Sequence, residues 1–352
     1  MRKSKGRVFV AMSGGVDSSV AAALLKERGF DVVGAHLKCF NVDGCAAQDA
    51  EDARRAAEHL GIPFYTFDFE KEYKDQVVQY MIDGYKKGIT PNPDVMCNKE
   101  IKFGLFYKKA MEMGADFVAT GHYVRLMKKS GKPILAIARD SKKDQSYFLW
   151  AIKPEQLEKC LFPIGNLKKP QVRKLAVKFG LHNAAKKDSQ GICFLGQVSL
   201  PDFLKKYIKP KVGAIVNEAG EVIGEHNGAH FYTIGQRHGL NIGGFEKPLY
   251  VADKDMKKNI VVVAEGDDAK ALYKKEADLT SLNIFNIEIF KSCKTIPVLA
   301  RVRYRQPVAK ATFVKNKLVF AKPMKFVAEG QSAVFYDTKG IMLGGGVIAK
   351  VK

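Results

Sequence analysis

The fold is decided by residues 7–19, which read RVFVAMSGGVDSS. The apolar run 7–12 predicts a buried strand, 13–18 predicts a glycine loop, and the Ala- and Leu-rich stretch that follows predicts a helix ended by Gly29. A loop between a strand and a helix N-terminus gathers backbone N–H groups and a positive potential. The segment is therefore suited to holding a phosphate group.

The residue types in this loop fit the same chemistry. Gly14 and Gly15 allow a sharp turn and the close approach of an anion, while Ser13 and Ser18 offer hydroxyl donors. The loop is neither a Walker A motif, because it lacks G-K-[ST] and its lysine, nor a GxGxxG motif. A glycine turn in which Ser18 is an ordinary N-cap is the structural alternative.

Strand and helix patterns alternate outward from this loop. Strands are expected at 31–40, 62–69 and 115–123, and helices at 47–61, near 70–87 and near 98–113. This alternation predicts an α/β fold with a parallel sheet covered by helices.

The pattern of predicted elements changes further along the chain. A hairpin is expected around 123–139, followed by helical stretches near 154–161, 170–180 and 201–208. Short alternating segments with Gly and Asn/Asp turns then predict a small β-rich region, and at least five strands from about residue 275 predict a barrel or sandwich. We expect three domains, at 1–208, 209–272 and 273–352.

The charge of the chain is +21 and is unevenly placed. Residues 101–200 carry 19 basic and 7 acidic side chains, and residues 281–352 carry 13 and 3, whereas the other segments are close to balance. Two separated basic stretches suit a surface that follows a phosphate backbone. A generically basic, solvated surface is the alternative.

Cysteine and histidine spacing excludes the common metal motifs. The six cysteines form no C-x-x-C pair and the seven histidines form no H-E-x-x-H motif, so no protein-bound metal site is predicted. No apolar run is long enough to span a membrane, and the first residues lead directly into a strand pattern without a signal-peptide core. We expect a cytoplasmic protein with no membrane association, in which any disulfide is transient and catalytic.

Two cysteines lie in contexts that favour chemistry. Cys97 follows the Pro-containing segment 90–96 at an expected helix start, close in sequence to Lys99 and Lys102, which favours its thiolate. Cys193 lies in the polar, glycine-bearing turn 187–194. Each cysteine alone is more often a small buried hydrophobic residue. No role is assigned to Cys39, Cys45, Cys160 or Cys293.

The loop 13–18 resembles the SGGxDS signature of the PP-loop ATP pyrophosphatases. That family cleaves ATP between the α and β phosphates and adenylates a carbonyl or amide oxygen. The resemblance implies ATP and Mg²⁺, a Rossmann-like PP-loop domain, a loop that holds pyrophosphate, and an Asp17 carboxylate that organises the phosphates or the metal.

Seven further motifs extend the resemblance over nearly the whole chain. They are TPNPDxxCNxxIKFG (90–104), TGHY (120–123), KDQSYFL (143–149), DSxGICF (188–194), TIGQRHGL (233–240), RVRYRQ (301–306) and LGGG (343–346). In this order they resemble the tRNA-specific 2-thiouridylases, which make 2-thiouridine at the wobble base. Leu37 and Gln190 depart from the family pattern, where methionine and threonine are common.

The resemblance implies roles for individual residues. Cys193 would carry a persulfide, Cys97 would be its partner through a Cys97–Cys193 disulfide, and Asp94 would be the acid/base group. ATP contacts fall on Ala11, Met12, Ser13, Gly14, Gly15, Val16, Asp17, Ser18, Leu37 and Gly121. Contacts with the target uridine fall on Asn92, Pro93 and Asp94. Other tRNA contacts fall on His122, Lys143, Asp144, Gln145, Tyr304, Arg305 and Gln331.

The resemblance also implies partners, namely the anticodon loop of tRNA and a sulfur donor such as a cysteine desulfurase or a sulfur-relay protein. Two other functions stay open at this point. One is a PP-loop ligase acting on a small metabolite, which needs neither cysteine. The other is a non-catalytic RNA-binding protein whose loop only senses nucleotide.

Overall fold

The structure is a computed structural model that describes residues 4–42, 46–129, 131–188, 194–196, 198–285, 290 and 293–352. The chain divides into two compact units. The first contains Met1–Val77, Pro93–Gln197 and Lys339–Met342, and the second contains Val78–Asn92, Val198–Thr338 and Leu343–Lys352. Neither unit is one continuous stretch of sequence.

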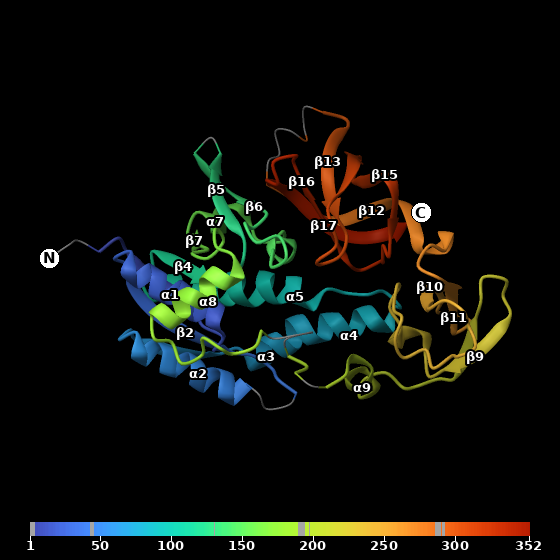
Figure 1. Cartoon of the computed structure of the whole chain (residues 1–352), viewed down its shortest axis with the longest axis horizontal. Coiled ribbons are helices and arrows are strands. Elements are labelled where there is room, and N and C mark those ends of the chain that lie inside the picture. Colours follow the sequence, from blue (N-terminus) through green and yellow to red (C-terminus); the bar gives the residue numbers. More distant parts are fainter. Residues whose placement is uncertain are drawn as a thin grey trace. The chain divides into compact units, whose positions relative to one another are not determined.

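A five-stranded parallel sheet forms the first unit, with the order β3-β2-β1-β4-β7 (Figure 1). Its strands are β1 (Arg7–Ala11), β2 (Asp31–Lys38), β3 (Phe64–Asp68), β4 (Phe117–Thr120) and β7 (Cys160–Leu161). Strand β1 is central and apolar on both sides. Val8 and Val10 lie in the core on one face, and the Phe9 ring stacks on Tyr65 on the other. The predicted α/β fold with a parallel sheet is confirmed.

Three helices bury one face of this sheet: α1 (Val16–Glu27), α2 (Ala46–His59) and α8 (Lys169–Lys178). Small residues such as Ala22 of α1 and Ala56 of α2 are fully buried, which lets the helices approach closely. Helix α1 ends where predicted, because Gly29 adopts a φ of 88° that suits a residue after the last helical turn.

Except at 93–96 and 146–148, where no helix is expected, the other helical segments lie at the expected positions. They are α3 (Glu70–Tyr73), η1 (Lys74–Val78), α4 (Gln79–Lys86), α5 (Pro93–Met96), η2 (Cys97–Phe106), α6 (Tyr107–Glu112), η3 (Ser146–Phe148) and α7 (Pro154–Leu157). Segment η2 is a π-helix, a rare form that is frequently found at functional sites.

The predicted hairpin is also present, as β5 (Arg125–Lys129) and β6 (Lys132–Ala136). A short segment from the end of the chain joins it. Ala136 forms a bridge with Ile341, the Ile137 amide donates to the Gly340 carbonyl at 2.9 Å, and Ile134, Ala136 and Ile341 form a small apolar cluster. Residues 339–342 therefore belong to the first unit.

The second unit contains two β structures. A four-stranded sheet has the order β10-β11-β8-β9, formed by β8 (Gly213–Val216), β9 (Val222–His226), β10 (Leu249–Asp255) and β11 (Ile260–Glu265). Short helices α9 (Leu200–Lys205), η4 (Ala229–Phe231) and η5 (Lys270–Leu272) accompany it.

A closed six-stranded barrel has the order β12-β15-β14-β13-β16-β17. Its strands are β12 (Tyr273–Ile284), β13 (Ile296–Arg301), β14 (Ala309–Val314), β15 (Lys317–Lys325), β16 (Ser332–Tyr336) and β17 (Met342–Val351). The barrel core is aromatic, with Phe313, Phe320 and Phe335 buried. A Cβ atom at Gly344 would lie 2.5 Å from the Asn283 carbonyl oxygen, so glycine lets β17 approach β12. The predicted C-terminal barrel is confirmed.

The second unit holds both the small sheet and the barrel, which the sequence analysis assigns to separate domains. The division at 1–208, 209–272 and 273–352 remains a proposal. None of the helices in the described part of the chain combines the length and the apolar character needed to span a membrane.

Lys254 of β10 gives a prediction about pH and stability. Its ammonium donates to the Tyr232 carbonyl at 2.8 Å, and burial lowers its pKa from 10.5 to about 8. Between these two pH values the unfolded chain binds more protons, so the stability of the wild type rises with pH there. We expect Lys254→Met to stabilise the protein by roughly 2 kcal/mol at pH 7, after subtraction of the lost hydrogen bond.

Thermal melts of the Lys254→Met variant and the wild type between pH 7 and 10.5 test this. The gap in melting temperature should shrink across that window, whereas Lys258→Met, at an exposed position, should follow the wild type throughout. A gap that is independent of pH would contradict the assignment.

Candidate active site

The glycine loop lies at the point where the strand order reverses. From β1 the chain runs outward through β2 and β3, then returns to β4 on the other side of β1. Ala11 and Thr120, the last residues of β1 and β4, are register partners. In open parallel sheets the crevice beyond the carboxyl ends of two such strands is the usual ligand site.

Hydrogen bonds shape the loop from both sides. The Ser13 amide donates to the Ser18 hydroxyl at 3.2 Å, and that hydroxyl donates to the Gly15 carbonyl at 3.1 Å. Asn183 is buried and its amide nitrogen donates to the Gly14 carbonyl at 2.9 Å and to the Ser19 hydroxyl at 3.0 Å. The loop is therefore held in one conformation by its own serines and by a residue far along the chain.

Gly14 and Gly121 show why the loop needs glycine. Gly14 has a φ of 72°, and a Cβ atom there would lie 2.3 Å from the Asp49 carbonyl oxygen. Gly121 directly follows β4, and a Cβ atom there would lie 2.6 Å from the backbone nitrogen of Ser18. The first turn of α1 thus packs directly on the backbone beyond β4. Leu37 lies on β2, where it pairs with Phe67 of β3.

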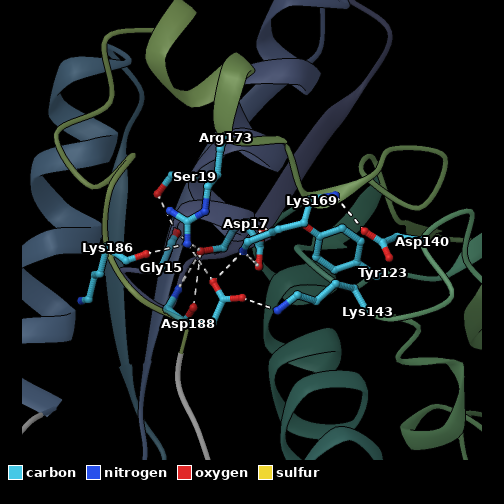
Figure 2. Close-up of polar contacts among 12 residues, drawn as sticks. Gly15, Asp17, Ser19, Tyr123, Asp140, Lys143, Lys169, Arg173, Lys186 and Asp188 are labelled. Carbon is cyan, nitrogen blue, oxygen red and sulfur yellow. Dashed lines mark hydrogen bonds and ion pairs between the residues drawn. The ribbon is translucent and has the colours of Figure 1, made fainter. Parts of the chain in front are cut away.

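An ion-pair cluster surrounds Asp17, in the first turn of α1 (Figure 2). The Lys169 ammonium lies 2.8 Å from both Asp17 carboxylate oxygens and 2.7 Å from Asp188 Oδ1. The Tyr123 hydroxyl donates to Asp17 Oδ1 at 2.8 Å. Asp188 also pairs with Lys143 at 2.5 Å and Arg173 at 3.2 Å. Positive charge from two separate segments, the loop that contains Lys143 and the helix α8, is thereby gathered next to the glycine loop.

The environment fixes the charge states of two members of this cluster. Burial by itself would raise the pKa of Asp188, but the hydrogen bonds from Lys143 and Lys169 outweigh it and lower the pKa. Burial and the neighbouring Asp17 carboxylate raise the pKa of Tyr123 far above its usual value. At neutral pH Asp188 is an anion and Tyr123 remains a hydroxyl donor.

Cys97 and Asp94 also lie in the first unit. Cys97 is 4% exposed and is the first residue of η2, which continues directly from α5, so the helical segment begins at Pro93 and not, as expected, at Cys97. Asp94, on α5, is partly exposed, and its carbonyl accepts from the Asn98 side chain at 2.9 Å. Cys193 lies outside the described residues, so its predicted disulfide with Cys97 stays a prediction. No disulfide joins any two of the described cysteines.

The predicted tRNA residues of the first unit have internal roles. His122 is 7% exposed and packs against Phe103 and Phe162, and burial and Lys102 lower its pKa well below the usual value. This is the environment of a structural histidine. The prediction of RNA contact for His122 therefore depends on the resemblance alone.

The triplet 143–145 is similarly engaged. Asp144 is 2% exposed and accepts from the Ala138 amide at 3.0 Å, and Gln145 exchanges two hydrogen bonds with the Tyr123 backbone. Lys143 pairs with Asp188 in the cluster described above. The three residues thus hold this loop beside the end of β4, and their contact with tRNA remains a prediction.

The remaining predicted tRNA residues, apart from Pro93, lie in the second unit. The Gln331 side chain donates to the carbonyls of Thr90 and Pro91 at 3.0 and 3.3 Å, directly before Asn92. Arg305 is exposed, has a φ of 62° and lies 5.3 Å from the centre of the Tyr304 ring. Gln331 therefore fixes the backbone that leads into Asn92, Pro93 and Asp94.

Sequence reasoning did not single out Lys169, Arg173 or Asn183. Their contacts with the loop span more than 150 residues of sequence or pass through Asp188, and no short motif marks them. Asp188 opens the DSxGICF motif, which was the one available signal.

Models of known protein families match three successive segments of the chain. Residues 6–197 match the model described as the tRNA methyl transferase HUP domain, 201–265 match the tRNA methyl transferase PRC-barrel domain, and 279–348 match the aminomethyltransferase beta-barrel domain. A solved 4-thiouridine synthetase–RNA complex with bound ATP is 19% identical, with a TM-score of 0.39, over 57% of this chain and 49% of that chain.

Relatives of similar length share much more of the sequence. The tRNA-specific 2-thiouridylase of Geobacillus kaustophilus is 46% identical over 99% of this chain and 96% of its own length. That of Listeria monocytogenes is 46% identical over 98% and 95%. With this identity over nearly the whole length, the chain belongs to the tRNA-specific 2-thiouridylase family of sulfurtransferases.

Proposed function

We propose that this protein catalyses the ATP-dependent 2-thiolation of the wobble uridine of tRNA, with release of AMP and pyrophosphate. One observation carries the proposal: the first unit holds both a glycine loop at the strand reversal and Cys97 at the start of η2, three residues after Asp94. An anion-binding loop supplies activation, and a thiol supplies sulfur chemistry. The family membership of the chain supports the tRNA substrate.

Activation is needed because the C2 oxygen of uracil is a poor leaving group. Attack of this oxygen on the α-phosphorus of ATP forms a phosphate ester and releases pyrophosphate, and the oxygen then departs in AMP. The backbone of Ser13, Gly14 and Gly15 and the N-terminus of α1 would hold the phosphates. Ala11, Met12, Val16, Ser18, Leu37 and Gly121 complete the proposed nucleotide contacts.

A magnesium ion fits this loop if phosphate oxygens supply most of its ligands. No group of three or more His, Cys, Asp or Glu side chains within the described ranges could hold a metal ion alone. Asp17 would contribute one carboxylate, since its side chain is 29% exposed at the loop. When bound, Mg²⁺ neutralises phosphate charge.

Sulfur transfer then uses the two cysteines. The terminal sulfur of a Cys193 persulfide attacks C2 as AMP leaves, and the Cys97 thiolate attacks the Cys193 sulfur, which releases 2-thiouridine and leaves a Cys97–Cys193 disulfide. Alternatively Cys97 attacks first and hydrosulfide is the nucleophile. In both orders an external thiol reduces the disulfide, and a cysteine desulfurase or a sulfur-relay protein restores the persulfide. Asp94 is the proposed acid/base group.

The target base must leave its stack, which costs little in a single-stranded anticodon loop. Asn92, Pro93 and Asp94 are proposed to contact it, and Gln331 fixes the backbone before Asn92. The proposed tRNA surface adds His122, Lys143, Asp144 and Gln145 of the first unit, and Tyr304 and Arg305 of the second.

Replacement of both Arg303 and Arg305 by glutamate tests the role of the barrel. Both side chains are exposed, and phosphate contacts are strongly salt-dependent. We expect tRNA affinity to fall at least about tenfold, and the slope of log K against log salt to decrease by about 2. Filter binding at several salt concentrations measures both quantities, and an unchanged slope would remove the barrel from the RNA surface.

The function itself is tested by incubating the protein with total tRNA, Mg-ATP and a sulfide source. Nucleoside mass spectrometry then measures 2-thiouridine and a parallel assay measures AMP. Equal yields of the two support the proposal. AMP without thiolated nucleoside would favour a ligase for a small metabolite, and tRNA binding without AMP would favour a nucleotide-sensing RNA-binding protein.

A further inference from the structure

The glycine loop contains no lysine, although the triphosphate that it is proposed to hold carries several negative charges. In the motif SGGVDS no residue is basic, and the preceding β1 carries only Arg7 at its far end. The structure brings an ammonium to the loop from elsewhere. Lys169 begins α8, and its Nζ lies 2.8 Å from both carboxylate oxygens of Asp17 (Figure 2).

The backbone of Lys169 is fixed. Its amide donates to Asp140 Oδ2 at 2.9 Å, and the amide of the preceding Lys168 donates to the Gln171 side-chain oxygen at 2.8 Å. Helix α8 in turn packs in the same core as α1, the helix that begins at the loop. Because α1 and α8 pack against each other, the distance between the Lys169 backbone and the loop is fixed.

The side chain of Lys169 is 11% exposed and lies over the Tyr123 ring, with its Nζ 5.8 Å from the ring centre. A buried ammonium is costly unless anions surround it. Asp17 of α1 and Asp188, which follows α8 in the chain, supply that compensation. The arrangement keeps a desolvated, charged lysine at the mouth of a loop built for anions.

We propose that Lys169 is the phosphate-binding lysine of this nucleotide site, and that it stabilises the negative charge that develops on the phosphates of ATP as pyrophosphate leaves. This inference rests on the proposed function for its identification of ATP. Asp188 is a positioning residue, which holds the ammonium beside the loop. A cation aimed at developing charge in a water-poor site is an effective source of rate enhancement.

The experiment separates phosphate recognition from the rest of the reaction. Isothermal titration with Mg-tripolyphosphate, Mg-ATP and adenosine compares the wild type with Lys169→Met and Lys169→Arg. We expect Lys169→Met to weaken tripolyphosphate and ATP binding at least about tenfold, with adenosine binding unchanged. Lys169→Arg should recover part of the loss. AMP formation with tRNA should fall about 10²-fold or more in Lys169→Met.

Lys186→Met is the matched control. Lys186 is also partly buried between two carboxylates, Asp49 and Asp52, at 2.7 and 2.6 Å, but neither of them is in the loop. Its variant should lose stability as Lys169→Met does and still bind tripolyphosphate as the wild type does.

Equal tripolyphosphate and ATP affinity in the wild type and Lys169→Met would overturn the inference, as would an equal loss in Lys186→Met. These titrations contain neither tRNA nor a sulfur source. A wild type that binds tripolyphosphate through Lys169 but makes no 2-thiouridine would therefore refute the proposed function and leave the assignment of Lys169 intact.

Discussion

Cys97→Ser is expected to lower the rate of 2-thiouridine formation by at least about 10³-fold, the scale seen when a covalent nucleophile is removed. A serine hydroxyl cannot form a disulfide and cannot take over the sulfur of Cys193. Cys97 is 4% exposed. Serine has nearly the same shape as cysteine, so we expect the packing at the start of η2 to be preserved. Titration should give ATP affinity within about twofold of the wild type, while nucleoside mass spectrometry detects the loss of product.

The matched control is Cys160→Ser. Cys160 is equally buried, burial raises the pKa of its thiol far above the usual value, and the thiol donates to the Gln156 carbonyl at 3.1 Å. A protonated, inert thiol predicts full activity for this variant. Cys193→Ser should match Cys97→Ser. Thiolation that survives in either Cys97→Ser or Cys193→Ser would rule out the two-cysteine mechanism.

The second large effect is expected from Gly121→Ala. A Cβ atom there would lie 2.6 Å from the Ser18 nitrogen and 2.7 Å from the Asp17 carbonyl carbon, both of which are backbone atoms of α1. Backbone atoms cannot rotate away from the new methyl group as a flexible side chain can, so the first turn of α1 must move. We expect a loss of about 3 kcal/mol in stability. A displaced phosphate loop should also lower AMP formation by about 10²-fold.

Two glycine variants separate crowding from a general effect of the methyl group. Gly243→Ala places its Cβ in open space, and Gly15→Ala meets only the Ser13 hydroxyl at 3.5 Å. Denaturant unfolding should find both near wild-type stability. If Gly121→Ala unfolds at the same denaturant concentration as these two, then α1 does not pack on residue 121 as the structure has it.

The sequence predicted the parallel sheet because its signal is local. The strands β1 to β4 are short and largely apolar, and α1 and α2 are followed by Gly29 and Gly61, both of which have positive φ. The two-residue strand β7 was not predicted, because it lies in the stretch 154–161, where a helix is expected. Local patterns also located the loop 13–18 and the hairpin 125–136. The order of the strands, and hence the meeting of β1 with β4, depends on contacts that periodicity does not encode.

The site could be predicted only where a motif is contiguous. Lys169 reaches Asp17 across 152 residues of sequence, and a lysine that opens a helix next to a proline resembles any other helix start. Sequence also does not distinguish an RNA contact from a structural bond. Asp144 and Gln145 belong to a polar, apparently exposed triplet, yet one is buried and the other is bonded to the Tyr123 backbone.

The turn at residues 339–342 has a consequence for how the protein is made. It pairs with the end of β6, which is synthesised some two hundred residues earlier. During translation the parallel sheet of the first unit therefore emerges well before residues 339–342, and the unit cannot be completed until those residues have left the ribosome. The emergence of residues 339–342, rather than synthesis of the sheet, sets the earliest moment at which this unit is whole.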